Sequence, residues 1–452
     1  MVTSEMAEVT MSKKTKKRRP NRRTYQRPGR AGPWGVPGGG PSLSMLILAG
    51  GGAAAKGDEM TFEEVSLALL DQANSLGQET VGAVLGEVVS NVLSQDFEHG
   101  WQPRELVRAS RRRRSGRHTE LLVTAMGADG VWRDAAGASP TPAWREQLVE
   151  LEVTSWWGSG LDWLGPWTRR AHLGWPEGLL IALETLGVLM ALPDLACLLP
   201  PPSQWAGWRP TAANHDADDP ILAKVRALLA KAESTSFDAE AEALTAKAQQ
   251  LMARHAIDEA IARNTGGPRS ERPTARRFAV DDPYASAKSR LLSAVAATNG
   301  GRSVWYEDFA LMAVVAFDAD LDAIDTLFTS LLVQGTRAML AKGKVVDGRG
   351  RSRTRSFRQS FLLAFADRIH ERLEHATAAA RHEAEEELAT SVLPVLASRD
   401  REVNDAVEAM FPHTRRMRGS RITSEEGWAA GRTAAELASL GPEGALTKEA
   451  TG

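Results

Sequence analysis

Cysteine is almost absent from this chain of 452 residues, in which Cys197 is the only one. A single thiol excludes intramolecular disulfides and every zinc module that is built on several cysteines. Such cysteine usage is typical of proteins from a reducing compartment, so we expect a cytoplasmic protein. The length predicts two or three domains.

The sequence also lacks the short motifs of common enzyme classes. It has no GxxxxGKS/T phosphate loop and no GxSxG nucleophile elbow. His370-Glu371 begins like the HExxH zinc helix, but position 374 is Glu374 and the next histidine, His375, is rotated well away from the first. His375 and His382 share a face of a charged helix that we expect to be exposed. We therefore predict no metal, no cofactor and no catalytic residue.

Long uninterrupted apolar runs are missing as well. The most apolar stretch, residues 179–199, is interrupted by Glu184, Pro193 and Asp194, which would be costly in lipid. We interpret it as a buried helix over 178–192. Residues 44–55 resemble the apolar part of a signal peptide, but their apolar core is too short, so we predict neither export nor a membrane partner.

The near balance of charge, 55 Lys and Arg against 57 Asp and Glu, hides a strong segregation. Residues 1–40 contain ten basic and two acidic residues, so this segment carries +8 and the remainder −10. Too few apolar residues are present to offset the entropy of ordering. We predict a disordered leader, rich in basic residues, Gly and Pro, over 1–60. It is either a tail that binds nucleic acid or an anionic surface, or a solvated, even untranslated, segment.

Apolar residues recur with helical spacing from Thr61 onward. We predict a helical, Trp-rich N-terminal region over 61–198, followed by a Pro-rich linker over 199–218. Seven of the 13 tryptophans lie between Trp156 and Trp208. Aromatic clusters can stack on bases, but they more often pack short helices together, so we interpret these tryptophans as core.

Two capped helices are predicted over 219–264. Asp219 and Pro220 suit the cap and first turn of the first helix, and Asp238 can cap the second. The connection is short, with Phe237 as a plug at the closed end, which predicts an antiparallel helical hairpin. The apolar stripes are formed by Ile221, Leu222, Val225, Leu228 and Leu229, and by Ala241, Leu244, Ala248, Leu251 and Met252.

Residues 221–258, ILAKVRALLAKAESTSFDAEAEALTAKAQQLMARHAID, closely resemble the bacterial and phage family called domain of unknown function 2786 (DUF2786). The resemblance implies a hairpin module but no activity. We expect Ser234 and Thr235 to satisfy backbone groups between the helices, and His255 to cap the end of its helix. The polar positions that carry the resemblance are Lys224, Arg226, Glu233, Ser234, Thr235, Glu240, Lys247, Gln249 and His255.

After a linker over 265–277, residues 278–440 are predicted to form an α+β domain, with a disordered tail over 441–452. The spacing predicts strands at 278–280, 303–306 and 311–317, and helices at 285–298, at 321–340 and along the stripe from Phe357 to Leu373. The fold class is therefore mainly α, with helices on a small, mainly antiparallel sheet. This region resembles the usual C-terminal companion of that family, domain of unknown function 7168, at Asp282–Tyr284, 327–340, Arg355–Phe361, Phe365 and Gly427–Arg432.

The strongest local charge lies between the last two of these helices. Residues 337–358 contain eight basic residues and one acid, Asp347, and three glycines predict a mobile loop. A flexible basic arm suits a polyanion, whereas a solvated loop is the alternative. A second basic run, 111–114, either contacts phosphates or favours the end of its helix. The candidate nucleic-acid-binding residues are Lys342, Lys344, Arg349, Arg351, Arg353, Arg355 and Arg358.

Charge segregation and the phage setting that the resemblance implies lead to one main hypothesis. We expect a non-enzymatic accessory protein that binds nucleic acid weakly and without sequence preference. The alternative is a protein-interaction scaffold that uses the Trp-rich helices or the Ala-rich hairpin face. A cryptic metal-dependent hydrolase is the third hypothesis.

Overall fold

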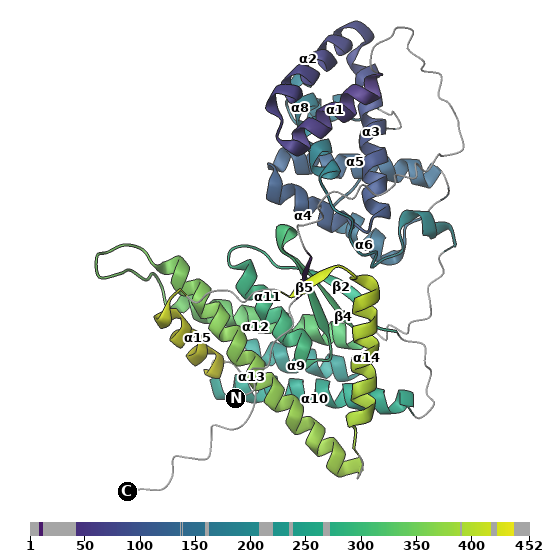
Figure 1. Ribbon diagram of the computed structural model, residues 1–452. Coiled ribbons are helices and arrows are strands. Elements are labelled where there is room, and N and C mark those ends of the chain that lie inside the picture. The colour runs from purple at the N-terminus through teal and green to yellow at the C-terminus, as the bar shows by residue number, and fades with distance from the viewer. Residues whose placement is uncertain are drawn as a thin grey trace. The chain divides into compact units, whose positions relative to one another are not determined.

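The computed structural model describes residues 9–11, 42–135, 137, 139–158, 162–207, 220–234, 238–264, 272–388, 391–416 and 423–437. The chain divides into two compact units (Figure 1). The N-terminal unit is Lys17–Thr211, and the C-terminal unit combines Met1–Lys16 with Ala212–Gly452.

Helices make up the described part of the N-terminal unit. A hydrophobic core of leucine, valine and tryptophan side chains holds them together. The helices are α1 (Leu43–Lys56), α2 (Glu59–Leu76), α3 (Gln78–Glu98), α4 (Pro103–Arg113), α5 (Gly116–Ala135), α6 (Pro142–Glu150), α7 (Leu164–Arg170), α8 (Trp175–Met190) and the 3-10 helix η1 (Pro202–Gly207).

Helix α1 corrects the predicted extent of the disordered leader. The prediction of an unfolded segment through residue 60 is wrong for 43–60, because Ser42 caps α1 and Ile47 is fully buried. The Gly/Ala-rich composition suggested disorder, yet it is what lets α1 approach α8: a Cβ on Gly51 would overlap Leu186, and one on Gly187 would overlap Ala54. A short strand, β1 (Val9–Met11), also lies inside the predicted leader.

The tryptophans of the N-terminal unit confirm the interpretation as core. Trp163, Trp167, Trp175 and Trp205 are all at least nine-tenths buried. Trp156, at 37% exposed, and Trp157, which is half-buried, are the exceptions. Trp208 lies outside the described residues. The buried rings are used in helix packing, so they do not form an open stacking surface for bases.

The apolar stretch predicted as a buried helix is α8, most of whose leucines are fully buried. No single helix in the described ranges is both long and apolar enough to cross a membrane. Only α7 and α8 taken together reach that composition, and they are bent by 114°.

The side chain of Asp96 on α3 makes the stability of the N-terminal unit depend on pH. It is 7% exposed, and its Oδ2 has no hydrogen-bond partner among the described residues. Burial, and secondly the charge of Asp194, raise its pKa from 3.8 to about 8. The folded state therefore keeps a proton that the unfolded chain has released, so stability falls as pH rises from about 4 to about 8.

We predict that Asp96→Asn removes this loss, because the amide does not titrate. Relative to the wild type, the variant should gain at least about 2 kcal/mol at pH 9 and little at pH 4. Urea unfolding across this pH range measures the difference, with Asp71→Asn, at an exposed position of α2, as the matched control. If the free energy of unfolding differs between wild type and variant by the same amount at every pH, the prediction is contradicted.

The C-terminal unit is built on a five-stranded sheet with the order β2-β4-β3-β1-β5. Strand β1 runs parallel to β3, and the other pairs are antiparallel, so the predicted mainly antiparallel sheet is confirmed. The predicted hairpin at 303–317 is β3 paired with β4. Besides β1, the strands of this sheet are β2 (Thr274–Ala279), β3 (Arg302–Tyr306), β4 (Leu311–Ala316) and β5 (Thr414–Arg416).

Seven α-helices of the described residues belong to this unit. The predicted helical hairpin is confirmed, since α9 and α10 pack against each other across a short connection. The predicted linker over 265–277 is wrong at its end, where β2 begins at Thr274, and α14 was not predicted. The helices are α9 (Pro220–Ser234), α10 (Asp238–Asn264), α11 (Ala285–Thr298), α12 (Asp318–Ala341), α13 (Thr354–Leu388), α14 (Leu393–Met410) and α15 (Glu425–Leu437), with the 3-10 helix η2 (Glu307–Phe309).

The helical hairpin of α9 and α10 shares one hydrophobic core with the sheet. Val225 and Leu229 of α9 and Met252 of α10 join the cluster that contains Trp305 and Met312 of the sheet, with α11, α12 and α13. The six residues of β4 are all buried, because helices cover both of its faces. On the second face, Phe411 at the end of α14 contacts the ring of Tyr306.

Helix α15 lies directly on the backbone of α13 (Figure 1). Gly427 and Gly431 are four residues apart, and a Cβ at either position would overlap the carbonyl oxygen of Phe357 or Phe361, respectively. Arg432 of α15 also forms a bidentate ion pair with Glu371 of α13, in which both N–O distances are 3.1 Å. The contact therefore requires glycine at these two positions.

We predict that Gly431→Ala destabilises the C-terminal unit by about 2 kcal/mol or more, because the added methyl group forces the two helices apart. Thermal unfolding and hydrogen exchange of α15 peptides check this. Gly348→Ala is the matched control, since a Cβ at that glycine meets no atom within 4 Å. Equal stability of the two variants would show that α15 does not pack in this way.

Candidate nucleic-acid interface

The segment between α12 and α13, residues 342–353, is a small hairpin, and we give the name basic hairpin to residues 342–358, which also include the first residues of α13. Val346 and Ser352 form an antiparallel bridge, and the amide of Arg353 donates to the carbonyl of Val345 at 2.8 Å. Gly350, with φ of 74°, supplies the positive dihedral angle of its turn. The structure thus differs from the predicted mobile loop: backbone hydrogen bonds hold the hairpin.

Asp347 organises the tip of this hairpin. Its Oδ1 accepts the backbone amides of Arg349 and Arg351 at 2.9 and 3.0 Å, and its Oδ2 accepts Nε of Arg351 at 2.9 Å. These hydrogen bonds, led by that of the Arg351 amide, lower the pKa of Asp347. The only acid of the segment is therefore used to shape the turn and leaves most of the surrounding positive charge uncompensated.

The basic side chains of the hairpin point to solvent. Apart from Arg351, they form no ion pair with any residue that the structure describes, and only Arg358 is partly buried. Exposed cations along a preformed ribbon can contact successive phosphates. The exposed set is Lys342, Lys344, Arg349, Arg351, Arg353 and Arg355, with Arg337 on the last turns of α12.

The other basic runs contribute less to this surface. In the run 111–114, Arg114 pairs with Glu184 at 3.1 Å, and Glu184 also contacts Nε2 of His118 at 2.7 Å. This arginine therefore serves the packing of α4, α5 and α8. The side chains of Arg415, Arg416, Arg418 and Arg421 lie outside the described residues, as does the basic run of the leader.

Those polar residues of the family resemblance whose side chains the structure describes do not gather at one place. Lys224 and Arg226 are exposed on α9, and Lys247 is exposed and donates to Gln250 at 2.9 Å. Gln249, in contrast, is fully buried. Thr235 and Phe237, and the side chains of Glu233, Ser234 and Glu240, lie outside the described residues.

His255 corrects one expectation. We predicted that it caps the last carbonyl groups of its helix, but α10 continues to Asn264, so the residue lies in the interior of the helix.

The histidines of α13 do not form a metal site in the described part of the chain. No three side chains of His, Cys, Asp or Glu converge there as a ligand set. His382 is 75% exposed and pairs with Glu386 at 3.3 Å, whereas His370 is buried at another position along the helix. The hydrolase hypothesis thus has no converging ligands to support it.

Sequence reasoning missed a polar cavity beside α13. His370, Glu374, Thr377 and Arg381 follow one another at spacings of four, three and four, so they share one helix face. This spacing was visible in the sequence. Its partners on α10, α11 and α14 were not, because they depend on tertiary packing.

Residues 221–259 match the family described as "Protein of unknown function (DUF2786)". The matched residues cover α9 from its second residue, the whole connection and most of α10. The resemblance of the hairpin is therefore confirmed over this range. No curated protein and no solved structure matches the chain.

Proposed function

We propose that this protein is a nucleic-acid-associated accessory protein that contacts phosphates through the basic hairpin. One observation carries the proposal: the hairpin presents a dense set of exposed cations on a backbone that is already hydrogen-bonded, and all of them except Arg351 form no ion pair with a described residue. A preformed ribbon loses less conformational entropy on binding than a flexible loop does. We further infer that the protein is of bacterial or phage type and cytoplasmic, and that residues 278–440 are the companion domain of the DUF2786-like hairpin.

The chemistry of the surface defines the mode of binding. Arginine and lysine contacts to phosphate are independent of sequence, and each releases condensed counterions. The one aromatic side chain of the basic hairpin, Phe357, is buried, so the described hairpin offers no exposed ring to stack on bases. We therefore expect weak affinity, little sequence preference and a steep dependence on salt.

Fluorescence anisotropy of the full chain with labelled duplex and single-stranded oligonucleotides tests the proposal. Binding at about 20 mM salt should weaken by at least about tenfold towards 200 mM, in line with several phosphate contacts. Two unrelated sequences should bind alike. Absence of binding at low salt, or affinity that is insensitive to salt, would refute the proposal.

The scaffold hypothesis makes the opposite prediction in a pull-down. A nucleic-acid tether loses its co-purifying material after nuclease treatment, whereas a scaffold keeps its partners. We expect loss, because most of the tryptophans and the apolar face of the DUF2786-like hairpin are already packed into cores.

A further inference from the structure

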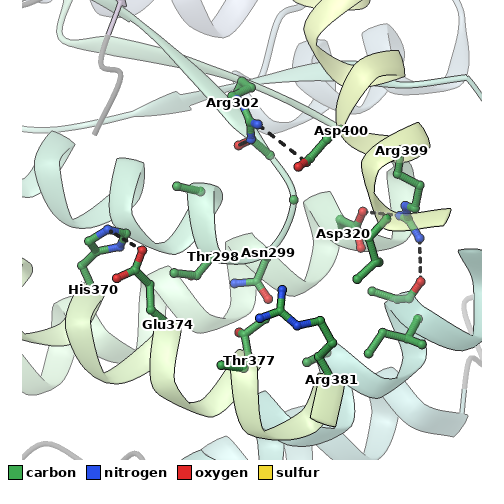
Figure 2. Close-up of a pocket in the computed structure, with 18 of the residues that line it drawn as sticks. Thr298, Asn299, Arg302, Asp320, His370, Glu374, Thr377, Arg381, Arg399 and Asp400 are labelled. Atoms are coloured by element: carbon green, nitrogen blue, oxygen red, sulfur yellow. Dashed lines mark hydrogen bonds and ion pairs between the residues drawn. The ribbon is translucent and has the colours of Figure 1, made fainter. Parts of the chain in front are cut away.

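A cavity of about 690 Å³ opens in the C-terminal unit, away from the basic hairpin, between α10, α11, α13 and α14. Figure 2 shows His370, Glu374, Thr377 and Arg381 lining it from α13. The volume lies within the range of pockets that hold small organic molecules.

Small residues create this space. The wall from α10, the end of α11 and the middle of α13 carries alanine and glycine where larger side chains would fill the gap. The residues concerned are Ala253, Ala256, Ala297, Gly300, Gly301 and Ala378. The cavity therefore has one wall of small apolar residues and one wall formed by the polar face of α13.

Two of the three arginines of the lining are already neutralised. Arg399 pairs with Asp320 at 2.5 Å, and Arg302 lies 3.6 Å from Asp400. Arg381 is half-buried and makes no hydrogen bond or ion pair with any described residue. Because a guanidinium does not lose its proton in a protein, this side chain is a fixed positive charge without a counterion.

A buried imidazole in the same lining makes no hydrogen bond with any described residue. His370 is 8% exposed, its Nδ1 has no hydrogen bond among the described residues, and its Nε2 lies 3.4 Å from Oε1 of Glu374. Buried polar atoms are nearly always hydrogen-bonded in native proteins. An imidazole left unsatisfied at the wall of a cavity therefore indicates a partner that the chain itself does not supply.

Gln249 positions Asn299 and Thr377, the polar side chains that lie between His370 and Arg381. It is fully buried, and its Nε2 donates to Oδ1 of Asn299 at 3.2 Å and to Oγ1 of Thr377 at 3.3 Å. Because Oγ1 of Thr377 accepts this bond, its own hydroxyl proton can be donated elsewhere. This polar position of the DUF2786 motif thus acts from behind the cavity wall.

We propose that the cavity binds a small organic anion whose carboxylate or phosphate head group is held by Arg381 and Thr377. The charges on the lining set the orientation of the molecule. Glu374 beside His370 disfavours a second negative group at that end, so the imidazole hydrogen-bonds an uncharged polar group of the ligand. The apolar part lies against the alanine and glycine wall.

Ligand-observed NMR with the full chain tests this proposal, using benzoate, phenyl phosphate and the uncharged benzyl alcohol as probes of similar shape. At least one of the two anions should bind at least about tenfold more tightly than the alcohol, because charge-assisted hydrogen bonds are the stronger ones. The anion that binds more tightly identifies the head group as carboxylate or phosphate.

Arg381→Gln should weaken binding of that anion at least about tenfold. The matched control, Arg401→Gln, changes an exposed arginine of α14 that donates a hydrogen bond to the carbonyl of Ala397, and it should leave the affinity unchanged. Thr377→Val gives a second, milder loss. Hydrogen exchange of α13 verifies that each variant is folded.

Three results would overturn the proposal: equal binding of the alcohol and the anions, an affinity that Arg381→Gln does not change, or no binding of either anion at about 10 mM, where even weak ligands are detected. In the last case the cavity holds water only. None of these results bears on the basic hairpin, so the nucleic-acid proposal is tested separately.

Discussion

Replacing Lys344, Arg349, Arg353 and Arg355 by glutamine should flatten the salt dependence of nucleic-acid binding by about four units on a log–log plot, about one for each phosphate that is no longer neutralised. At about 50 mM salt the affinity should fall at least about tenfold. The four residues are exposed, and none is an ion-pair partner of Asp347. The hairpin should therefore keep its shape while its positive charge is removed.

The leader provides the matched control for this experiment. Replacing Lys13, Lys14, Lys16 and Lys17 by glutamine removes the same number of charges from the other basic run. We expect a smaller change in slope, because we assign most of the phosphate contacts to the basic hairpin. A leader variant that abolishes binding, beside a hairpin variant that binds as the wild type does, would contradict the assignment.

The second large effect concerns the ion pair between Arg399 and Asp320. Both residues are at least nine-tenths buried, and the arginine also donates to the carbonyl of Ala256 at 2.8 Å and lies over the ring of Phe317 at 4.4 Å. It thereby links α14 to α12 and α10. Arg399→Met leaves a buried carboxylate without its partner and should destabilise the C-terminal unit by about 3 to 5 kcal/mol.

Urea unfolding, followed by hydrogen exchange of peptides from α11 and β4, measures this loss. The control is Arg254→Met, which breaks a surface pair with Glu387 and should cost at most about 1 kcal/mol. The double variant Arg399→Met with Asp320→Leu should recover most of the stability, since it leaves no unpaired charge. Equal effects of the two single variants would mean that the pair is not buried.

Regular elements with clear ends were predictable from the sequence. Helix α11 has the predicted bounds because Asn299-Gly300-Gly301 provides a stop, and the β3–β4 hairpin has the predicted alternation of β-rich runs. The DUF2786-like hairpin was predictable from its caps and its apolar stripe, and its packing against the sheet follows from that stripe.

Other elements left no usable signal in the sequence. Helix α14 buries Arg399 and Val403 among mostly polar neighbours, so its periodicity was hidden. Strand β1 has three residues and pairs with β3, which is distant in sequence. Helix α1 is rich in glycine, which suggested disorder but serves close packing against α8.

The two proposed sites also differ in how far the sequence predicts them. The positive charge of the basic hairpin was visible in the sequence, but the role of Asp347 in shaping its turn was not. The cavity was invisible because Gln249, Asn299 and Thr377 meet only after α10, α11 and α13 have packed together. Charge density is a local property of the sequence, whereas a cavity is a property of the fold.

Photo-crosslinking of a thiothymidine-containing oligonucleotide to the full chain, with mass spectrometry of the crosslinked peptides, tests the central claim most directly. We predict that crosslinks concentrate on residues 337–358 and disappear as salt is raised, because phosphate contacts by the basic hairpin bring the strand there. Crosslinks that instead concentrate on the leader or on residues 111–114, and persist at high salt, would contradict this account.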